Sequence, residues 1–409
     1  MRYLRVCLLL AASLALLACQ QNRDARVHIR IWHQKIAGER DLFNEEIGEF
    51  NAHHPDVVVE ALYKENEELR NLFVIAAVAG QGPDVVYGPA DNIGVMVTTK
   101  TILPLEKIFA ESFFARFSAG GVIQWQGSRW LVADQIGNHL TLIYNTTLVS
   151  RPPETLDELI AMGRLLTKHA SHDRKIEQYG LTWNYREPFF FIPFLTGFGG
   201  WVMDKDARPT LDTPEMVRAL QFVIDLRDKY QIIPKEGDYD VADMLFKENR
   251  TAMIINGPWS WSSYHVPDRA KVAPLPKNTE TGYWCEPMVS AKGYSVNAAA
   301  AGRKLPAIRE LIDFLTSDEV QRKMAAELST SPVSLAAIDS PEVRQNPTLI
   351  ASMAQIEHGR AMPIVPQMRA IWEAMRGPYQ LLMNGAITPQ EAARRMQREA
   401  EKNIAESSL

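Results

Sequence analysis

Apolar and polar residues alternate from position 27 onward in a way that predicts a strand followed by a helix. Val27 to Trp32 alternates with the period of a half-buried strand. Phe43, Ile47 and Phe50 then recur at a spacing that places them on one face of a helix. This stretch therefore predicts a strand with an amphipathic helix packed against it.

The same order of elements continues. Val57 to Val59 predicts a second strand, and residues 84–87 predict a third. The helix between them runs from about Asn66, a plausible N-cap, to Ala79, with Gly80 at the position where helices commonly end. A β-α-β-α-β order is typical of a parallel sheet with helices on its faces.

Ligands of such sheets bind beyond the carboxyl ends of the strands. This rule selects His33, Gln34 and Lys35, which follow the first predicted strand, and residues 88–92, which follow the third. We therefore expect polar groups of these two segments to face a ligand.

The middle and the end of the chain show turn and cap signals. Residues 125–130 predict a hairpin turn between two aromatic flanks, and Leu140 to Asn145 predicts a buried strand. Residues 152–153 begin a helical stretch. Residues 213–215 and 388–391 each supply an N-cap, a Pro in the first turn and an acidic residue. The second half of the chain should therefore also contain helices and strands.

The N-terminus has the pattern of an export signal. Arg2 and Arg5 precede an apolar run over residues 6–17, which is shorter than the about 20 residues that a helix needs to cross a bilayer. Residues 16–19 resemble the lipobox of bacterial lipoproteins, and a polar segment follows at once. This resemblance implies removal of residues 1–18, acylation of Cys19, a tether over residues 19–26, and a protein anchored at the extracytoplasmic face of a membrane. The alternative is an ordinary secretory signal with a chance cysteine.

Composition narrows the class of protein. The chain has 409 residues and is too long for one hydrophobic core, so two domains are expected. It has 3 Cys, and only Cys285 would remain free after export and acylation, so no intrachain disulfide is expected. The net charge is −5, with no basic run beyond the N-terminus, which argues against nucleic acid as a partner.

An aromatic cluster follows an apolar strand. Residues 252–255 predict the strand, and Trp259 and Trp261 come in the turn after it. An aromatic ring stacks on the apolar face of a sugar, while amides, carboxylates and arginines bind its hydroxyls. The alternative is that these indoles fill the core.

Two further clusters combine rings with charged groups. Trp372 and Arg376 lie one helical turn apart, so they share a helix face. Glu187 and Phe189 are expected to face a cleft, whereas residues 190–191 are expected in the core.

Taken together and in order, these motifs resemble the maltose- and maltodextrin-binding receptors of ABC importers. The resemblance covers essentially the whole mature chain. It is carried by residues 82–85, 142–145, 187–189, 256–259 and 362–368, followed by Trp372 and Arg376.

The resemblance implies an α/β fold of two lobes, each a mostly parallel sheet flanked by helices, joined by hinge crossings. The N-lobe would comprise residues 27–136 plus 292–344, and the C-lobe residues 140–288 plus 347–404. It also implies a monomer without enzymatic activity, cofactor or metal. Such a protein traps a small oligosaccharide by hinge closure and passes it to the membrane subunits of an importer.

The implied ligand-binding residues fall into stacking and polar groups. The stacking positions are Trp259, Trp372 and Phe189, the last where maltose receptors usually have Tyr. The polar positions, including two where the sequence departs from the maltose pattern, are Asp91, Glu187, Arg376, Gln34 and Asn138.

The departures bear on which sugar binds. Gly88 stands in place of a Trp, Asn92 in place of an Arg and Asn138 in place of a Glu, and the Asp-Lys pair expected after the first strand is absent. A buried polar group left unpaired costs about 1–3 kcal/mol, so these changes alter which hydroxyls can be bound. The ligand is expected to be maltose or a maltodextrin, trehalose, or a related α-glucoside.

Other functions remain open at this point. Asp91, Glu187 and Glu373 allow a secreted glycoside hydrolase, which needs two carboxylates across the scissile bond. A chemoreceptor adaptor, or a receptor for a phosphorylated polyol that uses Lys35 and Arg376, is a third possibility. Metal binding is not expected, because the histidines (His33, His53, His54 and His139) are scattered along the chain.

Overall fold

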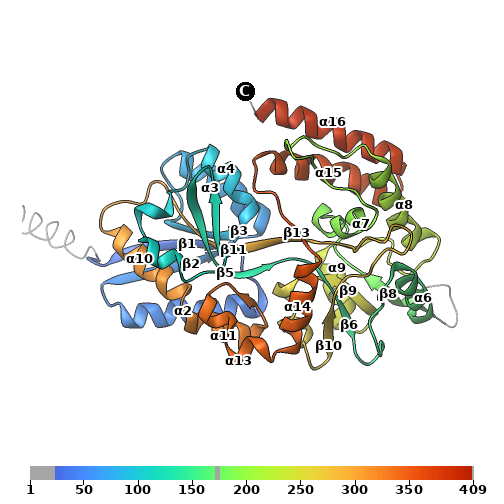
Figure 1. Ribbon diagram of the computed structural model, residues 1–409, viewed down its shortest axis with the longest axis horizontal. Helices are drawn as coiled ribbons and strands as arrows, with labels where there is room; N and C mark the ends of the chain where they lie inside the picture. Colours follow the sequence, from blue (N-terminus) through green and yellow to red (C-terminus); the bar gives the residue numbers. More distant parts are fainter. Residues whose placement is uncertain (1–23, 171–175, 408–409) are drawn as a thin grey trace, which may run out of the picture.

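The computed structural model describes residues 24–170 and 176–407, which form two lobes side by side (Figure 1). The predicted signal peptide, the predicted acylation site Cys19 and the first part of the predicted tether lie outside the described residues. Within the described part of the chain, no helix combines the length and hydrophobicity that a membrane crossing requires.

An eight-stranded sheet forms the centre of the first lobe, built from β1 (Val27–His33), β2 (Val57–Tyr63), β3 (Val85–Pro89), β4 (Val122–Trp125), β5 (Ser128–Asn138), β11 (Met288–Val296), β12 (Ser331–Pro332) and β13 (Arg360–Ala361). The main path runs β12-β5-β11-β3-β1-β2, while β4 pairs with β5 and β13 with β11. As the strand–helix pattern predicted, β1 pairs in parallel with both β2 and β3.

A five-stranded sheet forms the centre of the second lobe, built from β6 (Thr141–Asn145), β7 (Lys168–His169), β8 (Ile176–Thr182), β9 (Thr251–Asn256) and β10 (Ala270–Ala273). Its order is β10-β6-β9-β8-β7, and β8 and β9 are its parallel pair.

The architecture is the predicted two-lobe α/β class, but both sheets are mixed where mostly parallel sheets were expected. In the first sheet β11 pairs antiparallel with β3 and with β5, and in the second β6 pairs antiparallel with β9 and β10. The chain leaves the first lobe along β5 and returns along β11. Two neighbouring strands that cross between the lobes in opposite directions must be antiparallel.

The helices cover both sheets. Those of the first lobe are α2 (Ala37–His53), α3 (Asn66–Val78), α4 (Ile93–Thr98), α5 (Glu111–Phe114), α10 (Lys304–Leu315), α11 (Asp318–Leu328), α12 (Leu335–Ile338) and α13 (Pro341–Arg344). Those of the second lobe are α6 (Leu156–Leu166), α7 (Ile192–Gly197), α8 (Pro214–Asp228), α9 (Tyr239–Lys247), α14 (Pro347–Glu357), α15 (Gln367–Met383) and α16 (Pro389–Ser407). Short 3-10 turns are η1 (Ala90–Asn92), η2 (Leu105–Lys107), η3 (Pro188–Phe190), η4 (Pro258–Ser260) and η5 (Ser262–Tyr264).

The local sequence signals explain several of these elements. Phe43, Ile47 and Phe50 are buried along one face of α2, as their spacing predicted. Gln126 and Gly127 both have positive φ, of 49° and 82°, which is the backbone of the tight hairpin turn expected between β4 and β5.

Helix caps were predicted with one error. The hydroxyl of Thr213 accepts a hydrogen bond from the amide of Met216 at the start of α8, as predicted. At the start of α3 the cap is Glu65 instead of Asn66, because the Glu65 carboxylate accepts two amide hydrogen bonds of the first turn, at 2.9 and 3.2 Å. Gly80, with φ of +69°, follows this helix as expected.

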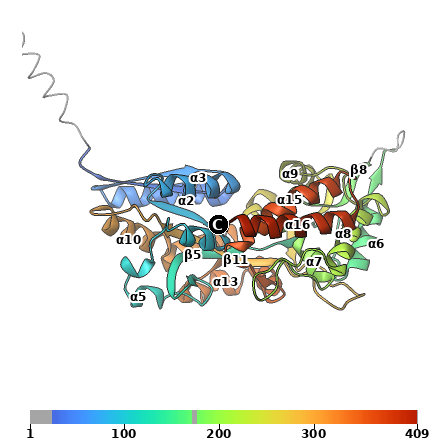
Figure 2. The same cartoon turned by 90° about the horizontal axis from the view of Figure 1, so that it is seen from above.

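Each lobe has a hydrophobic core of its own. One cluster draws on residues 29–133 and 291–333, and another on residues 140–288 and 362–400. Trp261, expected as one of two exposed indoles, is 1% exposed and belongs to a smaller cluster of the second lobe. The view from above separates α2, α3 and α10 from α8, α15 and α16, with β5 and β11 between them (Figure 2).

Candidate ligand-binding cleft

A cavity of about 550 Å³ lies between the two lobes and is lined by both. The first lobe contributes Gln34, Ile36, Glu39, Tyr63, Glu65, Asn66, Glu67, Arg70, Pro89, Asp91 and Lys292, and Asn138 at the end of β5 lies where the chain crosses between the lobes. The second lobe contributes Asn184, Glu187, Phe189, Phe190, Tyr239, Asp240, Trp259, Met362 and Trp372. Much of the first-lobe lining follows the carboxyl ends of β1, β2 and β3, which is where parallel strands place ligand-binding groups.

The cavity brings together seven of the eight predicted ligand-binding residues. They are Gln34 and Asp91 from the first lobe, Asn138 from the end of β5 between the lobes, and Glu187, Phe189, Trp259 and Trp372 from the second lobe. The eighth, Arg376, lies beside the cavity and binds the carboxylate of Glu187.

Three aromatic rings form a wall on the second lobe. The ring centroid of Phe189 lies 6.5 Å from that of Trp259 and 6.4 Å from that of Trp372. Phe189 and Trp259 are half-buried and therefore have ring surface to offer, whereas Trp372 is only 3% exposed. Half-buried rings beside a polar surface suit stacking against the apolar face of a sugar.

Asp91 lines the cavity and has one buried carboxylate oxygen without a hydrogen-bond partner among the described residues. It lies in η1, directly after β3, and its Oδ2 accepts a hydrogen bond from Nη2 of Arg70 at 3.0 Å. Its other oxygen, Oδ1, is buried and has no hydrogen-bond partner among the described residues. Burial raises the pKa of this carboxyl, and the attraction of Arg70 opposes the rise.

Arg376 shares its guanidinium between two carboxylates. Its Nη2 lies 3.0 and 3.2 Å from the two oxygens of Glu187 and 3.5 Å from Oε2 of Glu67. Burial raises the pKa of Glu187, and Arg376 opposes this effect. Arg376 thus holds the carboxylate that lines the cavity, and its direct contact with a sugar stays a prediction.

Lys35 was expected near the ligand but points into the first lobe. Its side chain is 2% exposed, and its Nζ lies 2.8 Å from Oδ2 of Asp134. The hydroxyls of Tyr87 and Tyr294 also donate to Asp134, at 2.9 and 3.2 Å. Lys35 is therefore committed to a buried network and does not reach the cavity. The neighbouring His33 is buried, which lowers its pKa to about 4.

The prediction from sequence missed several residues that line the cavity. Tyr63 is the last residue of β2, and Glu65 and Asn66 follow it, so the rule applied to the first and third strands would have found them. Glu39 and Lys292 form an ion pair across 253 positions of the chain, and no local pattern joins them.

The histidines considered as possible metal ligands do not form a cluster. His53 and His54 bind backbone carbonyls of the preceding turn, and His139 is 3.0 Å from the hydroxyl of Ser352. Within the described ranges, no group of three or more His, Cys, Asp or Glu side chains is arranged to hold a metal ion.

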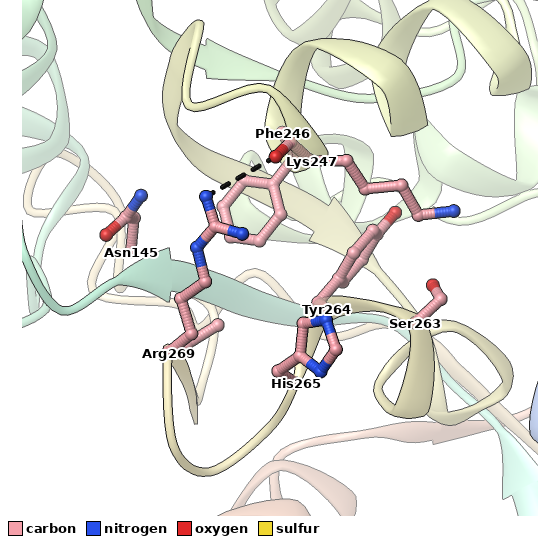
Figure 3. A pocket seen from close by; sticks show the side chains of 8 residues that line it. Asn145, Phe246, Lys247, Ser263, Tyr264, His265 and Arg269 are labelled. Atoms are coloured by element: carbon pink, nitrogen blue, oxygen red, sulfur yellow. Dashed lines mark hydrogen bonds between the residues drawn. The ribbon is translucent and has the colours of Figure 1, made fainter.

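A smaller hollow of about 270 Å³ lies on the second lobe alone (Figure 3). It exposes Lys247, His265 and Arg269, and the Arg269 guanidinium donates to the carbonyl oxygen of Lys247. The ring of Tyr264 beside it is 3% exposed. Because this hollow offers a sugar no wide ring surface and involves one lobe only, the cavity between the lobes is the stronger candidate site.

Comparisons with known proteins show which family and which solved structures the chain resembles. Residues 47–351 match the family described as bacterial extracellular solute-binding protein. The chain is 29% identical to the maltotriose-binding protein of Pyrococcus abyssi over 355 residues, which is 85% of this chain and 75% of that protein.

Two solved structures have closely similar folds. A maltose/maltodextrin-binding domain from Bdellovibrio bacteriovorus, bound to maltotriose, is 40% identical with a TM-score of 0.90, covering 93% of this chain and 100% of that domain. The maltotriose-binding protein of Thermus thermophilus, bound with maltotriose, is 25% identical with a TM-score of 0.82, covering 92% of this chain and 100% of that one.

Proposed function

The chain belongs to the family of bacterial extracellular solute-binding proteins, and on that premise we propose that it captures a small oligosaccharide between its lobes and delivers it to an ABC importer. The resemblance to maltose- and maltodextrin-binding receptors is confirmed by these relatives, as is the two-lobe fold. Capture would proceed by hinge closure, driven by ligand contacts to both lobes.

The observation that carries the proposal is the composition of the cleft. The rings of Phe189 and Trp259 on one lobe face carboxylates and amides on the other. Its volume of about 550 Å³ lies within the range of small-molecule sites. The ligand class is maltose or a maltodextrin, trehalose, or a related α-glucoside, and relatives that bind maltotriose favour the first of these.

The charges of the cleft support a neutral ligand over a phosphorylated polyol. Acidic side chains outnumber basic ones in the lining, with Glu39, Glu65, Glu67, Asp91, Glu187 and Asp240 against Arg70 and Lys292. A phosphate group would also need free cations. Lys35 and Arg376, the two candidates for that role, are both bound to carboxylates of the protein.

The arrangement also favours binding over hydrolysis. Asp91 and Glu187 each form an ion pair with an arginine. Glu373 is about half exposed, pairs with Arg369 at 2.9 Å, and is not part of the lining. Incubation of the protein with maltose, trehalose and dextrins should leave them intact, and the appearance of glucose would support the hydrolase alternative.

The domain limits and the anchor belong to the same proposal. We place the N-lobe at residues 27–136 plus 292–344 and the C-lobe at residues 140–288 plus 347–404, which the separate hydrophobic clusters support. Removal of the leader before Cys19 and acylation of that residue would hold a monomeric receptor at the extracytoplasmic face of a membrane. Mass spectrometry of the membrane fraction tests the acylation, and an unmodified N-terminus at another residue would contradict it.

Thermal unfolding with a ligand panel tests the proposed function. The panel contains maltose, maltotriose, maltotetraose and trehalose, with sorbitol 6-phosphate as the charged alternative. A ligand that binds only the folded state stabilises it by about 2.7 kcal/mol at 100 times its Kd. We expect a rise in Tm with at least one neutral oligosaccharide. A rise with sorbitol 6-phosphate alone would contradict the proposal.

A further inference from the structure

We propose that Glu39 and Lys292 form a hydroxyl-binding pair at the floor of the cleft and determine which sugar unit can stack on Trp259. The pair would bind two neighbouring hydroxyls, the carboxylate accepting from one and the ammonium donating to the other. Because the pair acts on the ligand, this role presupposes the proposed oligosaccharide function. Neither residue is part of the motifs that carry the family resemblance.

Two separate elements of the first lobe bring the pair to the cleft. Glu39 is the third residue of α2, just after the loop that follows β1. Lys292 lies in the middle of β11, opposite Pro89 of β3 and Gln135 of β5. Both side chains line the cavity between the lobes. The floor of the cleft therefore carries a carboxylate and an ammonium in contact.

The hydrogen bonds of the pair are incomplete. Nζ of Lys292 lies 3.3 Å from each oxygen of Glu39, which is long for charged groups, and Gln135 donates to Oε1 of Glu39 at 3.1 Å. Among the described residues, Glu39 is the one hydrogen-bond partner of this ammonium, which has three donors. Donor and acceptor capacity thus remains for a ligand.

Burial of this ion pair costs free energy, because two charged groups are removed from water. The side chains of Lys292 and Glu39 are 5% and 3% exposed. Burial alone would raise the pKa of Glu39, but the attraction of Lys292 and Lys35 and the hydrogen bond from Gln135 outweigh it, so the pKa is lowered and the carboxylate is charged. Apolar side chains of similar volume commonly replace a buried ion pair without loss of stability. Stability alone therefore does not account for this pair.

The pair also meets the aromatic wall of the other lobe. Nζ of Lys292 lies over the Trp259 ring, 5.3 Å from its centroid. Because the ammonium covers part of one face of this half-buried ring, a sugar unit in contact with the uncovered part of the ring would have its hydroxyl edge beside the ammonium and the carboxylate. Such a unit would contact both lobes at once, which is the condition for a ligand that favours closure.

The experiment must distinguish two roles of the pair: direct binding of ligand hydroxyls, and positioning of the Trp259 ring. Lys292→Met removes the ammonium and keeps the length of the side chain. The control is Lys323→Met, because Lys323 is 3.3 Å from Glu45, another glutamate of α2, and this pair is exposed and outside the cleft. Calorimetry measures binding of maltotriose and of analogues that each lack one hydroxyl, and thermal unfolding without ligand checks the fold.

We expect Lys292→Met to lower the affinity for maltotriose by about 10- to 100-fold, as for the loss of a charged hydrogen bond. In the natural protein, one pair of adjacent hydroxyls of maltotriose should matter most: an analogue that lacks either of them should bind about tenfold more weakly or worse. In the Lys292→Met variant, removal of at least one of these two hydroxyls should lower the affinity by less than about twofold, because the ammonium that binds it is already absent. Lys323→Met should behave like the natural protein throughout.

Two results would overturn the role of the pair while leaving the proposed function intact. One is an unchanged affinity of the Lys292→Met variant for maltotriose. The other is that the variant binds maltotriose and every analogue more weakly than the natural protein by the same factor. If Lys292→Met does not fold because Glu39 is left unpaired, Glu39→Gln/Lys292→Met removes both charges and gives the same readout. A natural protein that binds no oligosaccharide would refute the proposed function and this role together.

Discussion

Nη1 of Arg369 lies 2.7 Å from Oε2 of Glu67, and this ion pair joins α15 of the second lobe to α3 of the first. Arg369 also donates to Asn71 of α3 at 3.2 Å. Burial alone would raise the pKa of Glu67, but the attraction of Arg70, Arg369 and Arg376 outweighs it, so the pKa is lowered. These contacts join the two lobes directly, and an opening of the cleft would break them.

Glu67→Gln should therefore weaken the closed form. We expect the affinity for every sugar that binds to fall by a similar factor, about fivefold, because an ion pair that is partly open to solvent contributes up to about 1 kcal/mol. Calorimetry with maltotriose and maltose measures the factor. Glu68→Gln is the matched control, since Glu68 pairs with Lys64 of its own lobe. A loss confined to one sugar would instead indicate that Glu67 contacts the ligand.

Trp259→Ala should weaken sugar binding by about tenfold or more, which is about 1.4 kcal/mol. Its half-buried ring lines the cavity and packs against the core without being one of its buried residues, so stacking is lost while the buried core side chains stay in place. Calorimetry measures the loss. Trp125→Ala removes a half-buried indole of β4 that is not part of the lining and should leave affinity unchanged. Equal affinity of Trp259→Ala and the natural protein would refute the stacking assignment.

Trp372→Ala should also weaken binding by about tenfold or more, and in addition should lower stability. At 3% exposure this ring belongs to the core of the second lobe, and truncation of a buried Trp costs about 3–5 kcal/mol. Denaturant unfolding measures the stability of both tryptophan variants. We expect Trp372→Ala to lose clearly more stability than Trp259→Ala, and the reverse order would mean that the two rings are misassigned.

The stability of the first lobe should depend on pH through Glu46. This buried carboxyl of α2 has a pKa raised to about 8 by burial, with further effects from Lys35, Asp134, Lys323 and Glu327. Between its unfolded pKa of about 4.5 and about 8, the unfolded chain gives up this proton while the folded protein keeps it. Glu46 therefore lowers stability as pH rises through this window, by up to about 1.4 kcal/mol per unit.

Glu46→Gln should remove that cost. We expect the variant to be more stable than the natural protein at pH 7.5, with a smaller difference at pH 5, in urea unfolding. Glu45→Gln, which changes the exposed neighbour, should show no such pH-dependent gain. A difference for Glu46→Gln that does not grow with pH would mean that this carboxyl is ionised in the folded protein.

Much of the cleft was predictable because strand ends are local features. The alternating pattern of β1 marks the position of Gln34, and the apolar run of β3 marks the position of Asp91. The chain order of strands and helices places both at one edge of the sheet. The same reasoning placed Trp259 after β9, where the structure has it.

The remainder depends on contacts between distant parts of the chain. Arg376 shares a helix face with Trp372, as its spacing predicted, but its partner Glu187 is 189 positions away. Likewise, the pairing of β11 with β3 and β5 sets where Lys292 lies and makes the first sheet mixed. The spacing of apolar residues along a strand does not specify which other strand pairs with it. Neither feature could therefore be predicted from local sequence patterns.

Calorimetric titration of the mature protein with maltotriose tests the central claim most directly. The account predicts saturable binding of one molecule per chain with a Kd of about 1 μM or tighter, or about −8 kcal/mol. It also predicts about tenfold weaker binding by Trp259→Ala. Absence of binding by maltotriose, maltose and trehalose alike, with the protein folded, would contradict the claim that the cleft is an oligosaccharide site.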